Sequence, residues 1–599
     1  MPETTLSTVP VRIDALRAEL DSRGLDAFIV PRFDAHQGEY VAPRDERLAW
    51  VTGFTGSAGL AIVTADVVAV FVDGRYTVQL SKQCPSPPFE HHHLFDAPPE
   101  DWIAERMSAG SVIGFDPMHL PPTWYRRFKD AADRTGAELI PVEANPVDAV
   151  WVDQPAAPSG EISTFPLQFA GKKSADKQTD LLNAMNSVGA DFAVETQPDN
   201  IAWLLNVRGR DVEFNPIPHS FVLMASDGAT VWFVDQAKFA DDVPDALPKD
   251  IVVQPQETFL PTLRQRFGKD DKVLLDPEFS PSAVLLAVEA AGAVAIERPS
   301  ALTLAKAVKN ETELNGLRAC HIRDGVAWTE FSAWLATAVP TRAAAGDPLT
   351  EQEAEDKILE LRQGQPGFIY ESFKTISAAA GNAAMCHYAT SATSNALILP
   401  ENPYLIDSGG QYVTGTTDAT RSMSFGQTPP GYDEAYTAVY KAFHALATLR
   451  FPKGTQGHHI DAISRRPLWD LGLDYDHGTG HGIGHCLSVH EQPQRIGKIY
   501  NPVDLKPGMM MSIEPGYYEA DRFGIRIENL FEIIEAADGF MEFRNLTYAP
   551  IQTATLLNAR LTQAEKDWLN QYHADLEREL GPHLSDGAQT WLGSAIERL

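Results

Sequence analysis

Residues 475–494 read "YDHGTGHGIGHCLSVHEQPQ" and hold four histidines, the first three spaced four residues apart. This spacing would place imidazoles on one helical face, but glycine occupies every even position from 478 to 484, and each glycine costs a helix roughly 1 kcal/mol. We therefore predict an extended segment with His477, His481 and His485 on one face and only glycine on the other. Such a bare face indicates that a ligand or another backbone comes close.

The same stretch lacks the HExxH pattern of helical zinc proteases. Glu491 follows His490, but position 494 is glutamine rather than histidine. If a metal binds here, the remaining ligands must lie elsewhere in the chain.

Four acidic residues lie in or beside predicted strands in the same part of the sequence, and three of them follow or interrupt apolar runs, which predicts buried carboxylates. They are Asp407 after "YLI", Asp418 after "GTT", Glu514 after "MMMSI" and Glu528 within "GIRIENLF". Acidic side chains in buried strands are rarely tolerated without a partner. In a hairpin, Asp407 and Asp418 could face one another, which would be costly without a cation between them.

Arg526 offers an alternative, because it is two residues from Glu528 and could neutralise one or two acids in a buried ion-pair network. One arginine cannot neutralise all four acids. With His481, the four carboxylates match two divalent cations; mainly oxygen ligands suit Mn²⁺, and Zn²⁺ or Co²⁺ would bind too. Two such metals can hold a bridging hydroxide and polarise a carbonyl, the equipment for peptide hydrolysis.

The composition of the 599-residue chain indicates a soluble protein of two to four domains. A formal net charge of -32 argues against a nucleic-acid partner or an anionic membrane. The start does not resemble a signal peptide, and no run of about 18 apolar residues could span a bilayer. The four cysteines lack a CxxC pair, which fits a reducing cytoplasm, and we interpret them as small buried side chains: Cys84, Cys320, Cys386 and Cys486.

An internal repeat occupies the first half of the chain. "GLDAFIV" (24–30), "LAWVTGF" (48–54) and "AVFVDGRY" (69–76) correspond to "GADFAV" (189–194), "IAWLLNV" (201–207) and "VWFVDQAKF" (231–239). Each copy begins with an amphipathic helix that ends at glycine, followed by short β-branched and aromatic segments. The repeat predicts two related α/β domains, at residues 1–155 and 156–306.

A third domain is expected from residue 307 to 599. It begins with a helix that Asn310 caps while Glu313 reaches back, with Leu314 and Leu317 on the buried side. Its C-terminal extension contains a further helix around residues 561–573, to which we assign no chemistry.

The motif order "LIDSGGQY", "GTTDATRS", "HGTGHGIG", "VHE", "SIEPGYY", "GIRIEN" resembles the metal-dependent proteases of the pita-bread fold. These include methionine aminopeptidase, prolidase and aminopeptidase P. Residues 34–59 and 200–217 look like the first and second domains of long, three-domain cytosolic Xaa-Pro aminopeptidases. The resemblance implies an α/β chain with two creatinase-like N-terminal domains before a pita-bread catalytic domain.

The resemblance also implies a role for each site residue. Asp407 would ligate one metal, His481 and Glu514 the other, and Asp418 and Glu528 would bridge both. A bridging water or hydroxide would be the nucleophile, with Glu514 as proton acceptor. The remaining matches are His387, His477 and His490, which would serve the substrate and transition state, and Arg526, beside the metal-binding acids. Tyr388 and Tyr517 are candidates for the walls of a proline pocket.

Several histidines and one acidic cluster stand outside this pattern. "GNAAMCHYA" places Cys386 beside His387, and "GIGHC" places His485 beside Cys486, both departures from the family pattern. We expect His485 to be structural or merely nearby, and the roles of Cys386 and Cys486 stay open. His321 and the run at positions 91–93 are tempting as a metal site, but we expect the run to form a solvated loop. Asp34, His36 and Glu39 are expected to be structural, or else to line the substrate entrance or approach a partner's active site.

The function that the resemblance implies is hydrolysis of the N-terminal Xaa-Pro bond of peptides by a cytoplasmic, manganese-dependent aminopeptidase that forms a homodimer. Its substrates would be peptides with proline at the second position. The nearest alternative is a prolidase, which cleaves only dipeptides. A non-catalytic peptide-binding relative is a third reading, although such relatives typically lose metal ligands.

Overall fold

The computed structural model describes residues 8–596 and 598–599. The chain forms two compact units, each with its own core. One comprises residues 1–167 and 172–303, and the other comprises residues 168–171 and 304–599. No helix within the described residues is long and apolar enough to cross a membrane. The predicted domain limits at 155/156 and 306/307 stay a prediction.

The first unit begins with a six-stranded sheet in the order β4-β3-β2-β1-β5-β6. Its central strand β1 (Ala27–Pro31) pairs antiparallel with β2 (Leu60–Thr64) and parallel with β5 (Val112–Phe115). Side chains of β1 alternate between two cores, because Phe28 and Val30 pack with helix α1 (Val9–Ser22), whereas Ile29 packs with α5 (Pro122–Thr135) on the opposite face. The outer strands are β3 (Val68–Val72), β4 (Phe89–His93) and β6 (Glu138–Pro141).

A second sheet in the same unit repeats this topology in the order β12-β11-β10-β8-β13-β14. Its central strand β8 pairs antiparallel with β10 and parallel with β13, just as β1 pairs antiparallel with β2 and parallel with β5. The strands are β8 (Phe192–Glu195), β10 (Phe221–Ala225), β11 (Thr230–Phe233), β12 (Ile251–Gln254), β13 (Lys272–Leu275) and β14 (Val294–Glu297). The internal repeat and the α/β fold class predicted from the sequence are confirmed.

Two local predictions in this unit are wrong. "LAWVTGF" and "IAWLLNV" form helices α2 (Arg47–Thr52) and α9 (Pro198–Leu205), not strands. Residues in the left-handed conformation end both helices, Gly53 at φ 80° and Asn206 at φ 54°. The histidine run lies in edge strand β4 rather than a loop, where His92 stacks on Phe71 of the paired strand.

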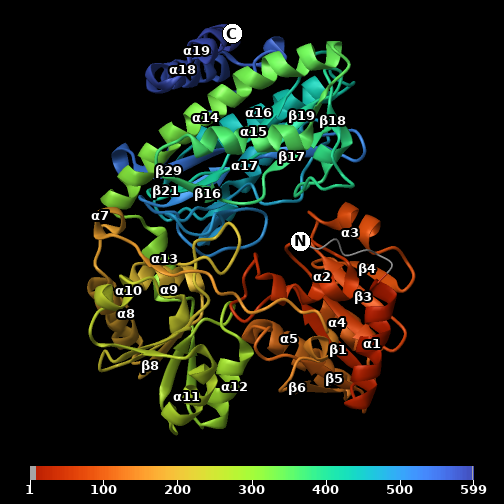
Figure 1. The fold of residues 1–599 in the computed structure, drawn as a ribbon, viewed down its shortest axis with the longest axis vertical. Helices are drawn as coiled ribbons and strands as arrows, with labels where there is room; N and C mark the ends of the chain where they lie inside the picture. The colour runs from red at the N-terminus through yellow and green to blue at the C-terminus, as the bar shows by residue number, and fades with distance from the viewer. Residues whose placement is uncertain (1–7, 597) are drawn as a thin grey trace. The chain divides into compact units, whose positions relative to one another are not determined.

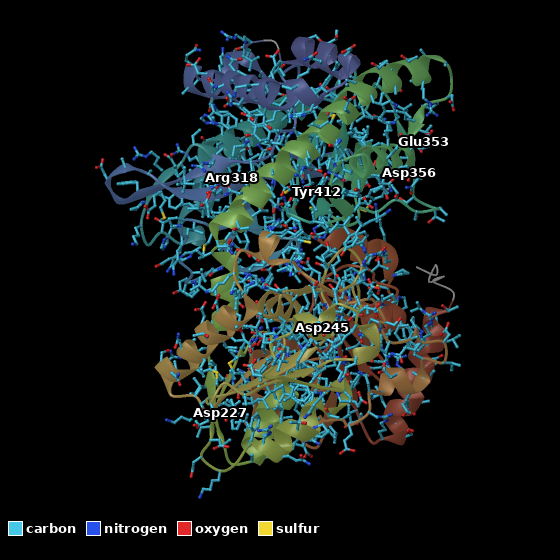
Figure 2. All side chains as sticks on the ribbon, turned by 60° about the vertical axis from the view of Figure 1, so that its left-hand side comes forward. Asp227, Asp245, Arg318, Glu353, Asp356 and Tyr412 are labelled. Atoms are coloured by element: carbon cyan, nitrogen blue, oxygen red, sulfur yellow. The ribbon has the colours of Figure 1, made fainter. Side chains whose placement is uncertain are left out.

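Helix α14 (Glu311–Ala344) opens the main body of the second unit (Figure 1). The predicted capping box is present, because the Asn310 side chain accepts from the Glu313 backbone and the Glu313 side chain accepts from the Asn310 backbone. Arg318 and Tyr412 mark this unit in Figure 2. Helix α18 (Gln563–Leu580) corresponds to the helix predicted around residues 561–573, and its Leu569 is buried.

Short antiparallel strands of the second unit carry the predicted site. One sheet has the order β17-β19-β22 and begins with β17 (Ile376–Ala379). Another has the order β23-β30-β29-β26 and includes β23 (Arg450–Pro452) and β30 (Phe540–Asn545). Two-stranded ribbons form from β24 with β25 and from β27 with β28. The strands that bear site residues are β19 (Tyr404–Asp407), β22 (Thr420–Met423), β24 (Gly480–Gly482), β25 (Glu491–Ile496), β26 (Met510–Ile513), β27 (Gly516–Glu519), β28 (Phe523–Arg526) and β29 (Asn529–Glu535).

Candidate metal centre and active site

The predicted metal-binding acids stand at the ends of these strands. Asp407 is the last residue of β19, whose partner across the sheet is Thr420 of β22, and Asp418 stands two residues before that threonine. Glu514 follows β26, and Glu528 lies between β28 and β29. Strand ends leave a carboxylate beside the sheet but still within or next to the core, which explains how three buried acids and the half-buried Glu514 come together.

Three carboxylate oxygens of this group are buried without a hydrogen-bond partner among the described residues. They are Asp407 Oδ1, Asp418 Oδ1 and Glu528 Oε1. Asp418 and Glu528 are 4% and 1% exposed, so these carboxylates have little contact with bulk solvent. A buried carboxylate without donors is costly unless a cation satisfies it. These oxygens therefore fit a metal site, as the carboxylate and imidazole donor set also does.

His481 faces the acids from β24. One ligand atom each from His481, Asp418 and Glu528 lie within 4.8 Å of one another, close enough to hold one metal ion. The Nε2 atom of His481 is 3.6 Å from Asp418 and 3.4 Å from Glu514, while its Nδ1 lies 2.9 Å from the Gly482 carbonyl oxygen. The backbone carbonyl fixes the ring so that Nε2 points at the carboxylates.

Two hydroxyl groups that the sequence reading missed orient these ligands. The Ser512 hydroxyl accepts from the His481 backbone N–H at 2.9 Å and donates to Glu514 at 3.2 Å. The Thr420 hydroxyl donates to Glu528 at 2.7 Å. Each stands two residues from a metal-binding acid, Ser512 before Glu514 and Thr420 after Asp418, and the period of two in strands is the signal that could have identified them.

Arg526 neutralises one acid and connects it to an aromatic neighbour. Its guanidinium donates to Asp407 Oδ2 at 2.7 Å, to the Thr420 hydroxyl at 3.0 Å and to the Tyr518 hydroxyl at 2.6 Å. The ion-pair alternative is therefore present at Asp407, but it leaves the other three carboxylates without arginine. Tyr518 was not predicted; in the β27–β28 ribbon it lies two residues from Gly516, the partner of Arg526.

Burial, together with the neighbouring charges, shifts the pKa values of the ionisable groups at the site in the absence of metal. Burial raises the pKa of Asp407 to about 7, although Arg526 opposes this shift. Burial likewise raises the pKa of Glu514 and of Glu528, and the neighbouring carboxylates add to the shift at Glu528. Burial opposes protonation of His481, yet Asp418 and Glu514 raise its pKa to about 9. A cation would relieve the repulsion that holds these protons.

The alternating glycines let neighbouring backbone approach β24. A Cβ atom at Gly480 would lie 2.0 Å from the Ser512 carbonyl oxygen, and one at Gly482 would lie 2.4 Å from the Glu491 carbonyl oxygen. At Gly478 the nearest atom would be 3.5 Å away, an ordinary contact. The extended segment is shorter than predicted, since only Gly480–Gly482 forms a strand.

The three predicted substrate histidines lie at different positions around this centre. His490 packs edge-on against His481 with ring centroids 4.4 Å apart. His477 places Nε2 2.9 Å from the Tyr518 hydroxyl oxygen and Nδ1 3.9 Å from Glu514. His387 is half-buried in the segment after 3-10 helix η4 (Ala380–Ala384).

Tyr388 differs from its predicted role as a pocket wall. The Tyr388 hydroxyl donates to Glu351 at 2.7 Å, inside the core beneath the His387 segment. Glu351 is fully buried and also accepts from the backbone N–H groups of Ala379 and Ala396, each at 2.7 Å. Tyr517 is half-buried against Phe523, so it remains a candidate.

Other groups singled out in the sequence are not among these ligands, although the Cys386 carbonyl oxygen accepts from the Arg526 guanidinium at 3.5 Å. His485 is buried, and a Cβ atom at Gly316 of α14 would lie 3.1 Å from its Nε2. His321 is bonded to the Leu317 carbonyl within α14. All four cysteines are free thiols, and Cys386 alone is not fully buried. In the first unit, buried Asp34 accepts from the backbone N–H groups of His36 and Gly38.

Known proteins match the chain along nearly its whole length. A model of metallopeptidase family M24 matches residues 315–535, models of the creatinase/prolidase N-terminal domain match residues 12–150 and 153–313, and one of the C-terminal region of peptidase M24 matches residues 539–599. The probable Xaa-Pro aminopeptidase P of Paracoccidioides brasiliensis is 36% identical over 97% of this chain and 98% of its own length. The chain belongs to the Xaa-Pro aminopeptidase P family of metallopeptidases.

Further relatives of this family agree. The probable Xaa-Pro aminopeptidase P of Neurospora crassa is 38% identical over 98% of this chain and 88% of its own length. The crystal structure of the X-prolyl aminopeptidase of Caenorhabditis elegans, described as a cytosolic enzyme with a di-nuclear active site, superposes with a TM-score of 0.93 at 32% identity. It covers 99% of this chain and 100% of that one. The predicted family and the pita-bread architecture of the catalytic domain are confirmed.

Proposed function

We propose that this protein is a metal-dependent aminopeptidase that hydrolyses the N-terminal Xaa-Pro bond of peptides. The observation that carries the proposal is the group of three buried carboxylate oxygens without donors, two of them on acids that lie within metal-binding reach of His481, in a chain of this family. Such a group is equipped to hold cations and is poorly suited to a purely structural role.

The residues that would hold two divalent metals are Asp407, Asp418, His481, Glu514 and Glu528. Mn²⁺ is our proposed metal because the donors are mainly carboxylate oxygens, and Zn²⁺ or Co²⁺ would also bind them. When bound, the cations supply an activated water and polarise the scissile carbonyl.

The protein's own groups would position the reactants and move the proton. Glu514 is half-buried beside His481 and accepts from Ser512, so its second oxygen can take a proton from the attacking water. Arg526 keeps Asp407 in a fixed orientation. The His477 ring is held by the Gly478 carbonyl oxygen at Nδ1 and by the Tyr518 hydroxyl at Nε2, and it would contact the substrate together with His387 and His490.

Proline explains why a dedicated site is needed. An Xaa-Pro bond is a tertiary amide without an N–H, and the proline ring restricts the backbone. An exopeptidase that expects an amide hydrogen cannot use this bond. We propose that histidine and aromatic walls recognise the ring instead, with Tyr517 among them.

The deciding test compares an Xaa-Pro-Pro tripeptide with an Xaa-Pro dipeptide on purified, manganese-loaded protein. We expect release of the N-terminal residue from the tripeptide, chelator-sensitive and restored best by Mn²⁺. Cleavage confined to the dipeptide would instead assign a prolidase. A protein that binds no metal and cleaves neither peptide would be a non-catalytic relative.

We also propose a cytoplasmic homodimer. The cysteine pattern supports the compartment. Sedimentation should give twice the chain mass of 65.7 kDa, and a mass equal to one chain would refute the dimer.

A further inference from the structure

A second buried charge cluster adjoins the site without containing a proposed metal ligand. Glu491 directly follows His490, and its side chain is fully buried between two lysines that are each 1% exposed. Lys309 Nζ donates to one carboxylate oxygen, and Lys306 Nζ lies 3.4 Å from the other. The proposed reaction gives these three residues no role.

The lysines belong to the joint between two helices. Lys306 stands in the last turn of α13 (Ala301–Ala307), and Lys309 immediately precedes the Asn310 cap of α14. The Lys309 ammonium also donates to the Lys306 carbonyl at 2.8 Å, and its backbone N–H donates to the Gly508 carbonyl at 2.9 Å. The cluster therefore fastens β25 to the start of α14.

Such a cluster is not required for stability alone. Burying three charged groups is expensive, and apolar side chains of similar volume often serve a core equally well. The best attested use of a buried ion pair is to fix one arrangement against others. Here the ion pairs would fix the path of the backbone at His490.

The path of β25 determines where His490 lies beside His481. Glu491 is the register partner of Gly482 in the β24–β25 ribbon, next to His481. The missing side chain at Gly482 lets the Glu491 backbone come close, and the rings of His481 and His490 are in edge contact. A displacement of Glu491 would move His490, its neighbour in the chain, whereas His481 is also held by the Ser512 hydroxyl and the Gly482 carbonyl.

We infer that Glu491, clamped by Lys306 and Lys309, is a positioning residue that holds His490 in its productive orientation. This inference rests on the proposed function, since it gives Glu491 a role in the same reaction. Outer partners of site residues commonly contribute 10- to 100-fold to activity.

The test is a double-mutant cycle on the full-length, manganese-loaded protein. Glu491→Gln keeps the size of the side chain and removes its charge; we expect kcat for the tripeptide to fall about 10- to 100-fold, with two metals per chain retained. In a His490→Ala background, the same change should alter kcat by less than about 2-fold, because the group it positions is gone. An equal loss in both backgrounds would overturn the inference.

A matched control is Glu532→Gln, which removes another buried carboxylate that pairs with α14, through Arg318 at 2.7 Å. We expect Glu532→Gln to leave kcat for the tripeptide unchanged. Lys309→Met removes one of the two ammonium groups that hold Glu491, so it should lower kcat as Glu491→Gln does, and only when His490 is present. It carries the test if Glu491→Gln fails to fold.

A spectroscopic readout separates this inference from the proposed function. In protein loaded with diamagnetic Zn²⁺ and labelled with ¹³C-histidine, the His490 ring resonance, assigned by its loss in His490→Ala, should shift in Glu491→Gln and stay in place in Glu532→Gln. An unmoved resonance refutes the positioning role even if the peptide is cleaved. A shifted resonance in a protein that cleaves no Xaa-Pro peptide refutes the proposed function alone.

Discussion

Asp418 is the acid with the strongest claim to the metals, because it lies within metal-binding reach of both His481 and Glu528. Replacing it by alanine removes a carboxylate that neither neighbour can substitute. We expect Asp418→Ala to bind fewer than two metals per chain and to lose more than about 100-fold in kcat, beyond the range of outer-sphere partners. Metal analysis and tripeptide hydrolysis measure both effects.

The control for this variant is Asp470→Asn, which changes an exposed carboxylate of the same unit. It should retain both metals and full activity. Full activity in Asp418→Ala would contradict the assignment of the centre.

The protons on Asp407 and His481 predict how metal affinity depends on pH. Their pKa values, about 7 and about 9, mean that the metal-free protein carries a proton on His481 at neutral pH and one on Asp407 below about pH 7. Both must leave before these groups ligate a metal, so affinity should rise as the pH increases from about 6 to 9, by about tenfold per unit for each proton.

Calorimetric titration of the metal-free protein with Mn²⁺ tests this. At pH 7, titrations in two buffers of different ionisation heat should give different apparent binding enthalpies. Their difference should equal the difference in buffer ionisation heat multiplied by at least one proton per chain. Identical enthalpies would show that no proton is displaced.

Not all residues around the metals were equally predictable from sequence. Asp407, Glu514 and Glu528 stood out because an acid in an apolar run is conspicuous in a single sequence, and Asp418 stood out because a hairpin would bring it opposite Asp407. Ser512, Thr420 and Tyr518 did not, because hydroxyl-bearing residues are common in strands and their value lies in which carboxylate or imidazole they meet. Tyr388 was misplaced for the converse reason: its sequence position beside His387 does not reveal that its hydroxyl turns toward Glu351.

At the scale of elements, β24 requires glycine at position 480 because the backbone of β26 lies close to it. Gly480→Ala would bring a methyl group to 2.0 Å from the Ser512 carbonyl oxygen, and that oxygen belongs to backbone that cannot turn away. We expect a loss of roughly 1 to 3 kcal/mol in stability, typical of overpacking, with weakened metal binding because His481 shifts. Denaturant unfolding and metal analysis give the two numbers.

Gly478→Ala is the matched control in the same segment, since its methyl group would meet only an ordinary contact at 3.5 Å. It should change stability by no more than about 0.5 kcal/mol. Equal effects of the two substitutions would show that backbone approach is not why glycine is needed at position 480.

Elements were predicted best where a local signal was complete. The Asn310 and Glu313 cap fixed the start of α14, and the glycine after each amphipathic segment marked the ends of α1 and α8 (Ser174–Val188). Helices α2 and α9 were missed because their aromatic and branched residues also suit strands. Burial of nearly every side chain in these short helices removes the polar face that would distinguish them.

The whole molecule is divided into two units, and all the proposed metal ligands belong to the second. We expect calorimetry to show two unfolding transitions, because each unit has its own core. Metal binding stabilises only the folded form that holds it, by about 2.7 kcal/mol at a free concentration of 100 times Kd. Chelator should therefore lower one transition and leave the other in place.

In Asp418→Ala the chelator should have much less effect on either transition. A single transition, or two that move together on chelation, would show that the units unfold cooperatively.

The matching strand orders of the two sheets in the first unit also affect how the chain folds. Each strand of one sheet has a counterpart with the same neighbours in the other, so during synthesis a strand can meet a partner from the wrong copy. Exchange of equivalent elements is a characteristic failure of tandem domains. The central strands have diverged to "AFIVP" and "FAVE", which differ in length and in the side chains they present to each core. Sequence divergence between the copies therefore protects the chain against misassembly, and making the copies more alike should increase aggregation during refolding.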